Sequence, residues 1–374
     1  NGRGGRLLHL LATSLAGPTL FPPQLSGGRS RTGGTAPGLC LCRRTIHASG
    51  GSRIFPCVQQ ATPGLRAPDP IKEDTNTMNA AYLTPAITLF NEDGTLDLVS
   101  QERLFNNLID QGVDGILVEG SSSEFFAMPM DQRREMAKFA IETVDHRVKL
   151  IIGTSHMVAD EIVSFSNFCL DAGADAVMIL PPYYFHFDAA ALLQYYDRLA
   201  QQIHGNIYIY NFPDNTGYTI PPETVLALAK IHPNIVGMKD TVAGMDHTRE
   251  LIKVVKSHIP QFEIYSGFDD NFAHNVLSGG DGCIGALSNV VPEVCAAWVR
   301  AFRENDLAGI AKGQQIIDRL MDLYTVRSPF LPVIKEACRL RGIAATSVGT
   351  FPMPSATVED DARILELLNR EGIQ

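Results

Sequence analysis

The chain has 374 residues, enough for one large domain or two ordinary ones, and its 45% hydrophobic and 19% charged residues are normal for a globular protein. Its formal net charge of −10 excludes a protein built to attract nucleic acid or an anionic membrane. No apolar run of about 18 residues predicts a transmembrane helix. The seven cysteines show neither a zinc-binding spacing nor a disulfide framework, so we expect reduced thiols.

Residues 1–77 differ from the rest of the chain. They are rich in Gly, Arg, Ser, Thr and Pro and show no sustained periodicity, so we expect a disordered leader with no core of its own. Three origins stay open: an organellar transit peptide, a signal peptide, or non-native sequence upstream of a start at Met78. A cytoplasmic location is expected if Met78 is the true start, and a mitochondrial or other organellar location if the leader is native.

From residue 83 onward, short apolar runs rich in β-branched residues alternate with amphipathic stretches of helical period. The predicted strands cover residues 83–90, 113–119, 150–153, 176–180, 207–210, 235–239, 262–266 and 283–286. Helices are predicted over residues 98–111, where Gly112 provides the stop, from Pro129 onward, and after residues 221–222. Eight strand–helix units predict the α/β class and a (β/α)8 TIM barrel over residues 78–305.

Two further segments complete the predicted organisation. Helical patterns over residues 307–323, 332–341 and 358–369 predict appended C-terminal helices, an extension over residues 306–374. Residues 280–285 match the pattern GxGxxG, but they precede a strand instead of opening a helix. We therefore interpret them as a tight turn, and the alternative of a doubly wound nucleotide-binding sheet is disfavoured.

Active residues of a barrel lie at the C-terminal ends of its strands, and Lys239 ends the sixth predicted strand. Strand alternation groups Lys239 with Ile235 and Gly237, which places it inside the barrel if those two face inward. Burial disfavours the charged form of lysine, and the neutral amine is the form that attacks a carbonyl carbon. The alternative is a lysine that reaches solvent or pairs with Asp240 or Glu119.

Tyr210 ends the neighbouring predicted strand and could relay protons to and from a substrate held by Lys239. Its alternative role is that of an aromatic side chain that only lines the barrel. Residues 121–123 are three serines in a loop leading to a helix, where hydroxyl and N–H groups could bind a carboxylate. Helix capping by Ser122 or Ser123 is the alternative.

Asp269 and Asp270 follow the seventh predicted strand. They could form an acid–base pair or bind a metal ion, but we favour capping of the next helix. Because the sequence contains no HExxH motif and no His/Cys cluster, we expect no metal site.

Four motifs together resemble the dihydrodipicolinate synthase/N-acetylneuraminate lyase family of class I aldolases. Residues 120–124 (GSSSE) resemble its carboxylate loop, residues 210–213 (YNFP) its tyrosine motif, and residues 237–241 (GMKDT) its Schiff-base motif. Residues 279–284 with Asn289 resemble its eighth-strand motif. The resemblance spans residues 83–340 and implies an enzyme without metal or cofactor that acts on a 2-oxo acid such as pyruvate and an aldehyde.

The resemblance also implies roles for individual residues. Lys239 would form the imine, Tyr210 would relay protons, Ser121 would supply a relay hydroxyl and Ser122 would bind the carboxylate. Tyr184 aligns with a tyrosine that often reaches a neighbouring subunit, which implies a homo-oligomer, a dimer or a tetramer. The further residues implied in substrate binding are Gly120, Ser123, Asn215, Thr241, Gly267, Phe268, Ile284 and Asn289.

Two departures from the family pattern bear on the substrate. Ser123 stands where the family usually has glycine, which would restrict the loop backbone. Asn215 stands where the lysine-pathway synthases usually keep an arginine, which argues against aspartate semialdehyde as the partner. The motif wording is most similar to 2-keto-3-deoxy sugar acid aldolases. A 4-hydroxy-tetrahydrodipicolinate synthase, an aldolase for 4-hydroxy-2-oxoglutarate or N-acetylneuraminate, and a non-catalytic barrel remain alternatives.

Overall fold

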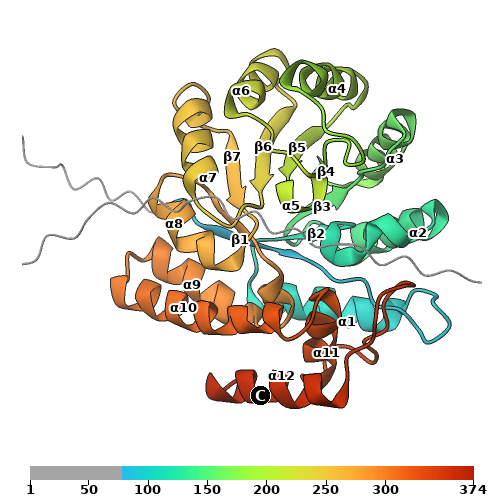
Figure 1. The fold of residues 1–374 in the computed structure, drawn as a ribbon, viewed down its shortest axis with the longest axis vertical. Coiled ribbons are helices and arrows are strands. Elements are labelled where there is room, and N and C mark those ends of the chain that lie inside the picture. The colour runs from blue at the N-terminus through green and yellow to red at the C-terminus, as the bar shows by residue number, and fades with distance from the viewer. Residues whose placement is uncertain (1–77) are drawn as a thin grey trace, which may run out of the picture. The chain divides into compact units, whose positions relative to one another are not determined.

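The computed structural model describes residues 78–374, so the expected leader over residues 1–77 lies outside the described residues. Eight parallel strands close into a barrel in chain order, and helices surround them (Figure 1), which confirms the predicted (β/α)8 TIM barrel. The strands are β1 (Ala81–Pro85), β2 (Gly115–Val118), β3 (Lys149–Gly153), β4 (Ala176–Ile179), β5 (Asn206–Asn211), β6 (Ile235–Asp240), β7 (Glu263–Ser266) and β8 (Gly282–Ile284). The helices up to the end of the barrel are α1 (Leu98–Gln111), α2 (Met130–Val144), α3 (Ala159–Ala172), α4 (Ala189–Gln202), α5 (Pro213–Thr216), α6 (Pro222–Ile231), α7 (Asp246–Leu251), α8 (Phe272–Leu277) and α9 (Pro292–Arg303).

Helix α1 shows how local sequence sets the boundaries of an element. The Asp97 side chain accepts a hydrogen bond of 3.0 Å from the Ser100 N–H, which satisfies one of the free donors of the first turn. Gly112 ends the helix with a φ of 91°, a left-handed conformation that glycine adopts without steric cost. The helix therefore occupies the predicted residues.

Strand β1 is shorter than predicted at its C-terminal end. The prediction extended to residue 90, but the strand ends at Pro85, and residues 86–90 form a loop. The Ile87 N–H donates to the Asn289 side chain and the Leu89 N–H donates to the Gln101 side chain, both at 3.0 Å. The loop backbone thus finds two of its partners in side chains of other elements, while the Ala86 N–H still donates to the Leu117 carbonyl of β2.

An irregularity in β6 corrects one step of the sequence argument. The register between β5 and β6 shifts, so that Ile207 pairs with Ile235 whereas Tyr208 pairs with Gly237. Ile235 consequently packs in the layer between the barrel and its helices, not in the interior as the simple alternation predicted. Beyond the shift Gly237 faces inward, and a Cβ there would lie 2.5 Å from the Tyr208 ring. The irregularity resets the alternation that leads to Lys239.

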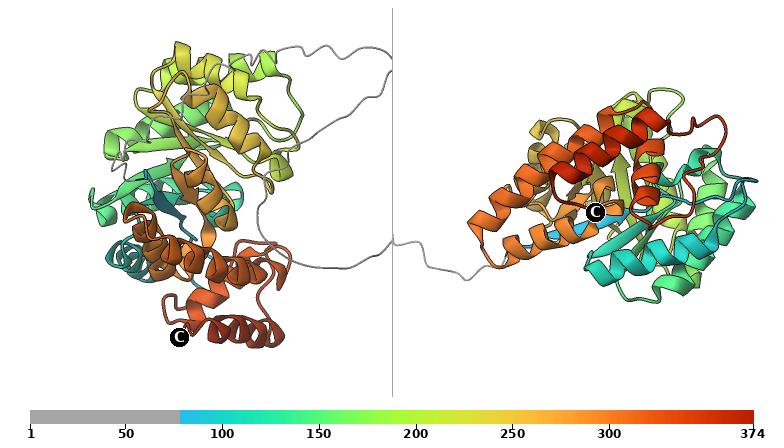
Figure 2. Two further views of the ribbon diagram at one scale, coloured as in Figure 1. Left: turned by 90° about the vertical axis from the view of Figure 1, so that its left-hand side faces the viewer. Right: turned by 90° about the horizontal axis from the view of Figure 1, so that it is seen from below.

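The C-terminal helices α10 (Leu307–Leu320), α11 (Leu331–Leu340) and α12 (Val358–Arg370) gather on the side of the barrel where α1 and α9 lie (Figures 1 and 2). A reciprocal capping box begins α12, because the Thr357 side chain accepts from the Asp360 N–H and the Asp360 carboxylate accepts from the Thr357 N–H. In residues 78–374, no helix is long and apolar enough to cross a membrane.

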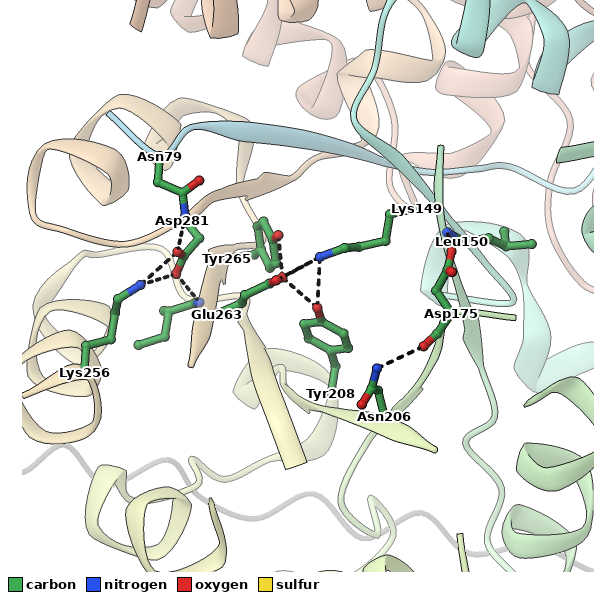
Figure 3. A network of polar contacts seen from close by, with 11 residues as sticks. Asn79, Lys149, Leu150, Asp175, Asn206, Tyr208, Lys256, Glu263, Tyr265 and Asp281 are labelled. Carbon is green, nitrogen blue, oxygen red and sulfur yellow. Dashed lines mark hydrogen bonds and ion pairs between the residues drawn. The ribbon is translucent and has the colours of Figure 1, made fainter. Parts of the chain in front are cut away.

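A polar network closes the N-terminal end of the barrel (Figure 3). The Glu263 carboxylate accepts hydrogen bonds from Lys149 Nζ at 2.8 Å, Tyr208 OH at 2.6 Å and Tyr265 OH at 2.7 Å. Beside it, Lys256 forms an ion pair of 2.6 Å with Asp281. Lys149 and Glu263 are the first residues of β3 and β7, so the network lies at the end of the barrel opposite to the residues predicted to act on a substrate.

Candidate active site

A cavity of about 410 Å³ lies at the C-terminal ends of the strands. It collects most of the predicted site residues from six separate segments of the chain. Those on its lining are Ser121, Ser122, Tyr210, Asn215, Lys239, Thr241, Gly267, Phe268 and Ile284. The structure thus brings together the serine loop, the tyrosine and the lysine on which the sequence argument rests.

Lys239 and Tyr210 lie next to each other on paired strands. They are register partners in the ladder between β5 and β6, and Lys239 Nζ lies 4.6 Å from the centre of the Tyr210 ring. Both side chains are buried, with Lys239 only 4% exposed. A lysine at this position meets an aromatic face and the cavity instead of bulk water.

The two carboxylates considered as partners for Lys239 are bound elsewhere. Asp240 points away from the barrel interior and accepts from His247 Nδ1 at 2.9 Å. Glu119 forms an ion pair of 2.6 Å with Arg133, and burial raises the pKa of Glu119 to about 7 even though the Arg133 charge opposes this shift. Within the described part of the chain Lys239 has no ion-pair partner, so the amine is available to a ligand in the cavity.

The serine loop takes a 3-10 turn over Ser121–Ser123, and none of its side chains caps that turn. Ser121 Oγ lies 3.5 Å from Tyr210 OH, which connects the loop to the tyrosine beside the lysine. Ser122 lines the cavity as well. Hydroxyl groups from two different strand ends therefore converge on the region in front of Lys239.

Thr241 and Gly267 shape the wall of the cavity beyond Lys239. Gly267 directly follows β7, and a Cβ there would lie 1.8 Å from Thr241 Oγ1, so only glycine fits at this position. Thr241 Oγ1 is buried and has no hydrogen-bond partner among the described residues. A buried hydroxyl without a partner is costly, and a ligand in the cavity could supply the missing hydrogen bond.

Four of the predicted site residues lie off the cavity lining. Gly120 precedes the serine turn, and Ser123 Oγ donates to the Ala86 carbonyl oxygen at 2.7 Å. The Asn289 side chain is occupied by the backbone of Pro85, Ala286 and Ile87. Tyr184 is 78% exposed and packs edge-on against Phe185 at 5.0 Å between ring centres.

The Ser123 departure from the family pattern does not strain the loop. The left-handed residue here is Glu124, with a φ of 61°, and Ser123 is not among the residues with positive φ. Glu124 is held in place by an ion pair with the buried Lys335 and by hydrogen bonds from the Thr350 N–H and hydroxyl at 2.7 and 2.8 Å. Ser123 therefore needs no backbone conformation that favours glycine.

Asp269 does not cap the next helix, which was the role favoured from sequence. Its carboxylate accepts from Tyr82 OH, from Tyr324 OH at 2.6 Å and from the Leu287 N–H at 3.0 Å, and it caps no helix. Burial raises the pKa of Asp269 although these hydrogen bonds oppose the shift. In residues 78–374 no group of three His, Cys, Asp or Glu side chains is arranged to hold a metal ion.

Sequence reasoning missed the contribution of the C-terminal extension. The lining residues from this part of the chain are Tyr324, Arg327, Ser328, Pro329, Phe330, Leu331 and Met353. They lie between the predicted helices, in stretches that the sequence analysis marked only by their prolines. Their position follows from packing against the barrel, for example through the ion pair between Lys335 and Glu124.

The match to known proteins agrees with this geometry. Residues 78–370 match the model of the dihydrodipicolinate synthetase family. The chain belongs to this family. Its members are Schiff-base lyases, and the chain is an aldolase or lyase of this kind.

Three relatives illustrate the range of the family. The Escherichia coli K12 protein YagE, a proposed 2-dehydro-3-deoxy-D-gluconate aldolase, is 36% identical over 76% of this chain and 93% of its own length. YjhH of the same organism, a proposed 2-dehydro-3-deoxy-D-pentonate aldolase, is 35% identical over 79% of this chain and 98% of its own length. A 4-hydroxy-tetrahydrodipicolinate synthase of Kosmotoga olearia is 34% identical over 70% of this chain and 88% of its own. The crystal structure of YagE in complex with pyruvate superimposes with a TM-score of 0.77, covering 79% of this chain and 99% of that one.

Proposed function

We propose that this enzyme cleaves a 2-keto-3-deoxy sugar acid to pyruvate and an aldehyde through a Schiff base on Lys239. The observation that carries the proposal is the environment of Lys239. It is a buried amine without a carboxylate partner in the described chain, it faces a cavity, and it lies against Tyr210. Such an amine is suited to attack a carbonyl carbon.

The proposed reaction uses residues that line the cavity. The Lys239 amine attacks C2 of the substrate, and loss of water gives the imine while Tyr210 transfers protons. Removal of the proton from the C4 hydroxyl breaks the C3–C4 bond, releases the aldehyde and sends the electron pair into the imine to form an enamine. Protonation of the enamine at C3 and hydrolysis of the imine give pyruvate and free Lys239. Because the imine accepts the electron pair, the proposal requires no metal and no cofactor.

The substrate carboxylate is assigned to the serine loop. Ser121 and Ser122 offer hydroxyl groups at the cavity wall, and the loop is fixed from behind by Glu124 and its buried ion pair with Lys335. Because the chain as a whole is acidic, local donors of this kind are needed to hold an anionic substrate. A carboxylate bound here would orient C2 towards Lys239.

The sugar-acid assignment is supported by Asn215 and by the named activities of YagE and YjhH. Asn215 lies at the exposed edge of the cavity and offers no charge to a second carboxylate. This weakens the competing assignment to aspartate semialdehyde, the partner in 4-hydroxy-tetrahydrodipicolinate synthesis. A neutral polar side chain can instead hydrogen-bond the hydroxyl groups of a sugar chain.

The test is a pyruvate-release assay with a panel of 2-keto-3-deoxy acids of five and six carbons, 4-hydroxy-2-oxoglutarate and N-acetylneuraminate. Condensation of pyruvate with aspartate semialdehyde is measured in parallel. We expect cleavage of a sugar acid that is lost in Lys239→Met. Faster condensation with aspartate semialdehyde than cleavage of any sugar acid would overturn the assignment.

We also propose that the active form is a homo-oligomer, a dimer or a tetramer, in which Tyr184 contacts a second copy of the chain. Tyr184 and Phe185 are neighbouring aromatic side chains exposed by 78% and 69% in the single chain, and contact with a second copy would cover both. Mass photometry of the intact protein and of Tyr184→Ala tests this proposal. A wild-type protein that is a monomer would contradict it.

A further inference from the structure

Directly behind Lys239 and Tyr210, on the outer face of the same two strands, lies a second pair of neighbours. Asn211 follows Tyr210 on β5, Asp240 follows Lys239 on β6, and the two are register partners. Asn211 Nδ2 donates to Asp240 Oδ1 at 2.7 Å, and both side chains are fully buried. The pair that faces the cavity is thus backed by a hydrogen-bonded pair that faces the helices.

Asp240 is the centre of this arrangement. Besides Asn211, its carboxylate accepts from Thr248 Oγ1 at 2.7 Å and from His247 Nδ1 at 2.9 and 3.0 Å. Three side chains from two elements therefore satisfy a carboxylate that is 1% exposed. A buried charge persists only when it is paired and hydrogen-bonded in this way.

The ring of His247 closes the arrangement. Its Nδ1 faces Asp240, and its Nε2 lies 3.0 Å from the Ile220 carbonyl oxygen. Both ring nitrogens face acceptors, an arrangement that suits the doubly protonated imidazolium. Burial lowers the pKa of His247, but the hydrogen bond and charge of Asp240 and the Ile220 contact outweigh it and raise the pKa.

Ile220 joins the two halves of the network. Its N–H donates to Asn211 Oδ1 at 3.0 Å, while its carbonyl accepts from His247. The hydrogen bonds thus form a closed ring through Asp240, Asn211, Ile220 and His247. This ring connects the end of β5, the end of β6, the start of α7 and the segment that leads into α6.

We propose that Asp240 and His247 are positioning residues that hold the C-terminal ends of β5 and β6 together, so that Tyr210 and Lys239 stay in contact. The inference rests on the proposed Schiff-base function. Neither residue lines the cavity, so both act through the strands that carry the reacting groups. A displacement of about 1 Å at a reacting group can cost about 100-fold in rate. Contacts that fix the ends of β5 and β6 therefore affect the reaction.

The test measures the rate of borohydride trapping with pyruvate in the full chain, as a function of pyruvate concentration. The first variant is Asp240→Asn, which places an amide N–H group where a carboxylate oxygen accepted hydrogen bonds. The second is His247→Gln, which replaces the ring that bridges Asp240 and the Ile220 carbonyl. We expect a fall of about tenfold or more in the maximal trapping rate, with little change in the half-saturating pyruvate concentration, because the serine loop is untouched. The double variant should lose about as much as the worse single variant, since both act as one unit.

Lys256→Gln is the matched control. It breaks a similarly buried ion pair, of 2.6 Å with Asp281, at the opposite end of the barrel. We expect it to lower the melting temperature and to leave the trapping rate unchanged. If Asp240→Asn fails to fold, the His247→Gln rate alone decides.

Wild-type trapping rates in His247→Gln, together with lower stability, would overturn the inference and leave the ring a purely structural feature. Absence of any adduct in the wild-type protein is a different result. It would remove the proposed function and this inference with it.

Discussion

The barrel holds a lysine against a tyrosine at each of its two ends. The partly exposed Lys149 also has a carboxylate partner, whereas the buried Lys239 has none among the described residues. At the N-terminal end Lys149 Nζ lies 5.8 Å from the centre of the Tyr208 ring, and at the C-terminal end Lys239 Nζ lies 4.6 Å from that of Tyr210. Glu263 accepts from both Lys149 and Tyr208, as Figure 3 shows. No carboxylate of the described chain takes that place beside Lys239.

This difference assigns the two ends their roles. A lysine bound to a carboxylate is held as an ammonium ion and stabilises the fold through its partner. Lys239 has no such partner among the described residues, so its amine is free to react with a carbonyl group in the cavity. Tyr208 and Tyr210 both lie on β5, whereas Lys149 comes from β3 and Lys239 from β6. We therefore assign a structural role to the pair at the N-terminal end and the proposed chemistry to the pair at the C-terminal end.

The largest effect among the variants below is expected for Tyr210→Phe. It keeps the ring beneath Lys239 and removes the hydroxyl group that lies 3.5 Å from Ser121 Oγ. Loss of a proton relay lowers turnover by ~10²- to 10⁴-fold, whereas the ring keeps the packing. Steady-state cleavage rates check this, and Tyr208→Phe at the other end is the control. Equal effects of both variants would contradict the division of roles.

A carboxylate introduced at the active end should make Lys239 resemble Lys149. Thr241 lines the same cavity and has a buried hydroxyl without a partner in the described chain, so Thr241→Asp adds the missing charge there. A nearby carboxylate favours the ammonium form by ~10-fold or more, and imine formation should slow accordingly. The trapping rate is compared with that of Thr241→Asn, which is neutral and of the same shape. Identical rates for the two variants would refute the electrostatic argument.

At the N-terminal end, Glu263→Gln should affect stability and leave the chemistry intact. It leaves Lys149 without its ion-pair partner. The Tyr208 and Tyr265 hydroxyl groups can still donate to the neutral amide oxygen of the new side chain. Loss of a charged hydrogen bond in a partly buried site costs ~1 to 3 kcal/mol. Urea unfolding measures the free energy, and the cleavage assay should give the wild-type rate. A loss of activity without a loss of stability would contradict this prediction.

The same carboxylate predicts a smaller effect of pH. Burial would raise the pKa of Glu263, but hydrogen bonds from Lys149, Tyr208 and Tyr265 outweigh it and hold the pKa below its ordinary value of 4.5. The stabilisation is therefore complete above the unfolded-state value and is lost as the pH falls through the folded-state value. Urea unfolding from about pH 6 to pH 3 should show a shallower loss of stability in Glu263→Gln than in wild type. Parallel curves for the two proteins would argue against the assignment.

Sequence patterns predicted this fold well where local rules determine the structure. Helix α1 occupies its predicted residues, because an N-cap at Asp97 and a glycine at 112 define its ends. The grouping of Lys239 with Ile235 was wrong, because the register shift in β6 depends on pairing with β5 and on the Tyr208 ring that crosses Gly237. The inward position of Lys239 was nevertheless right, since the shift restores the alternation before the strand ends.

The active site also combines features that the local sequence predicts with features that depend on packing between distant segments. Lys239, Tyr210 and Ser121 were found from strand ends and motifs, and the structure brings them to one cavity. The contribution of Tyr324 and Arg327 could not be predicted, because it depends on how the C-terminal extension packs on the barrel. Asn289 was expected at the substrate, but the structure commits its side chain to three backbone groups, which no motif reveals.

The most direct test of the central claim is borohydride reduction in the presence of pyruvate, followed by intact mass and peptide mapping. Both Lys239 and Lys149 face the barrel interior beside a tyrosine, so each serves as the other's control. The account predicts one reduced pyruvyl adduct per chain, on Lys239, and an unmodified Lys149. A folded protein without an adduct on Lys239, or with the adduct on Lys149, would contradict it.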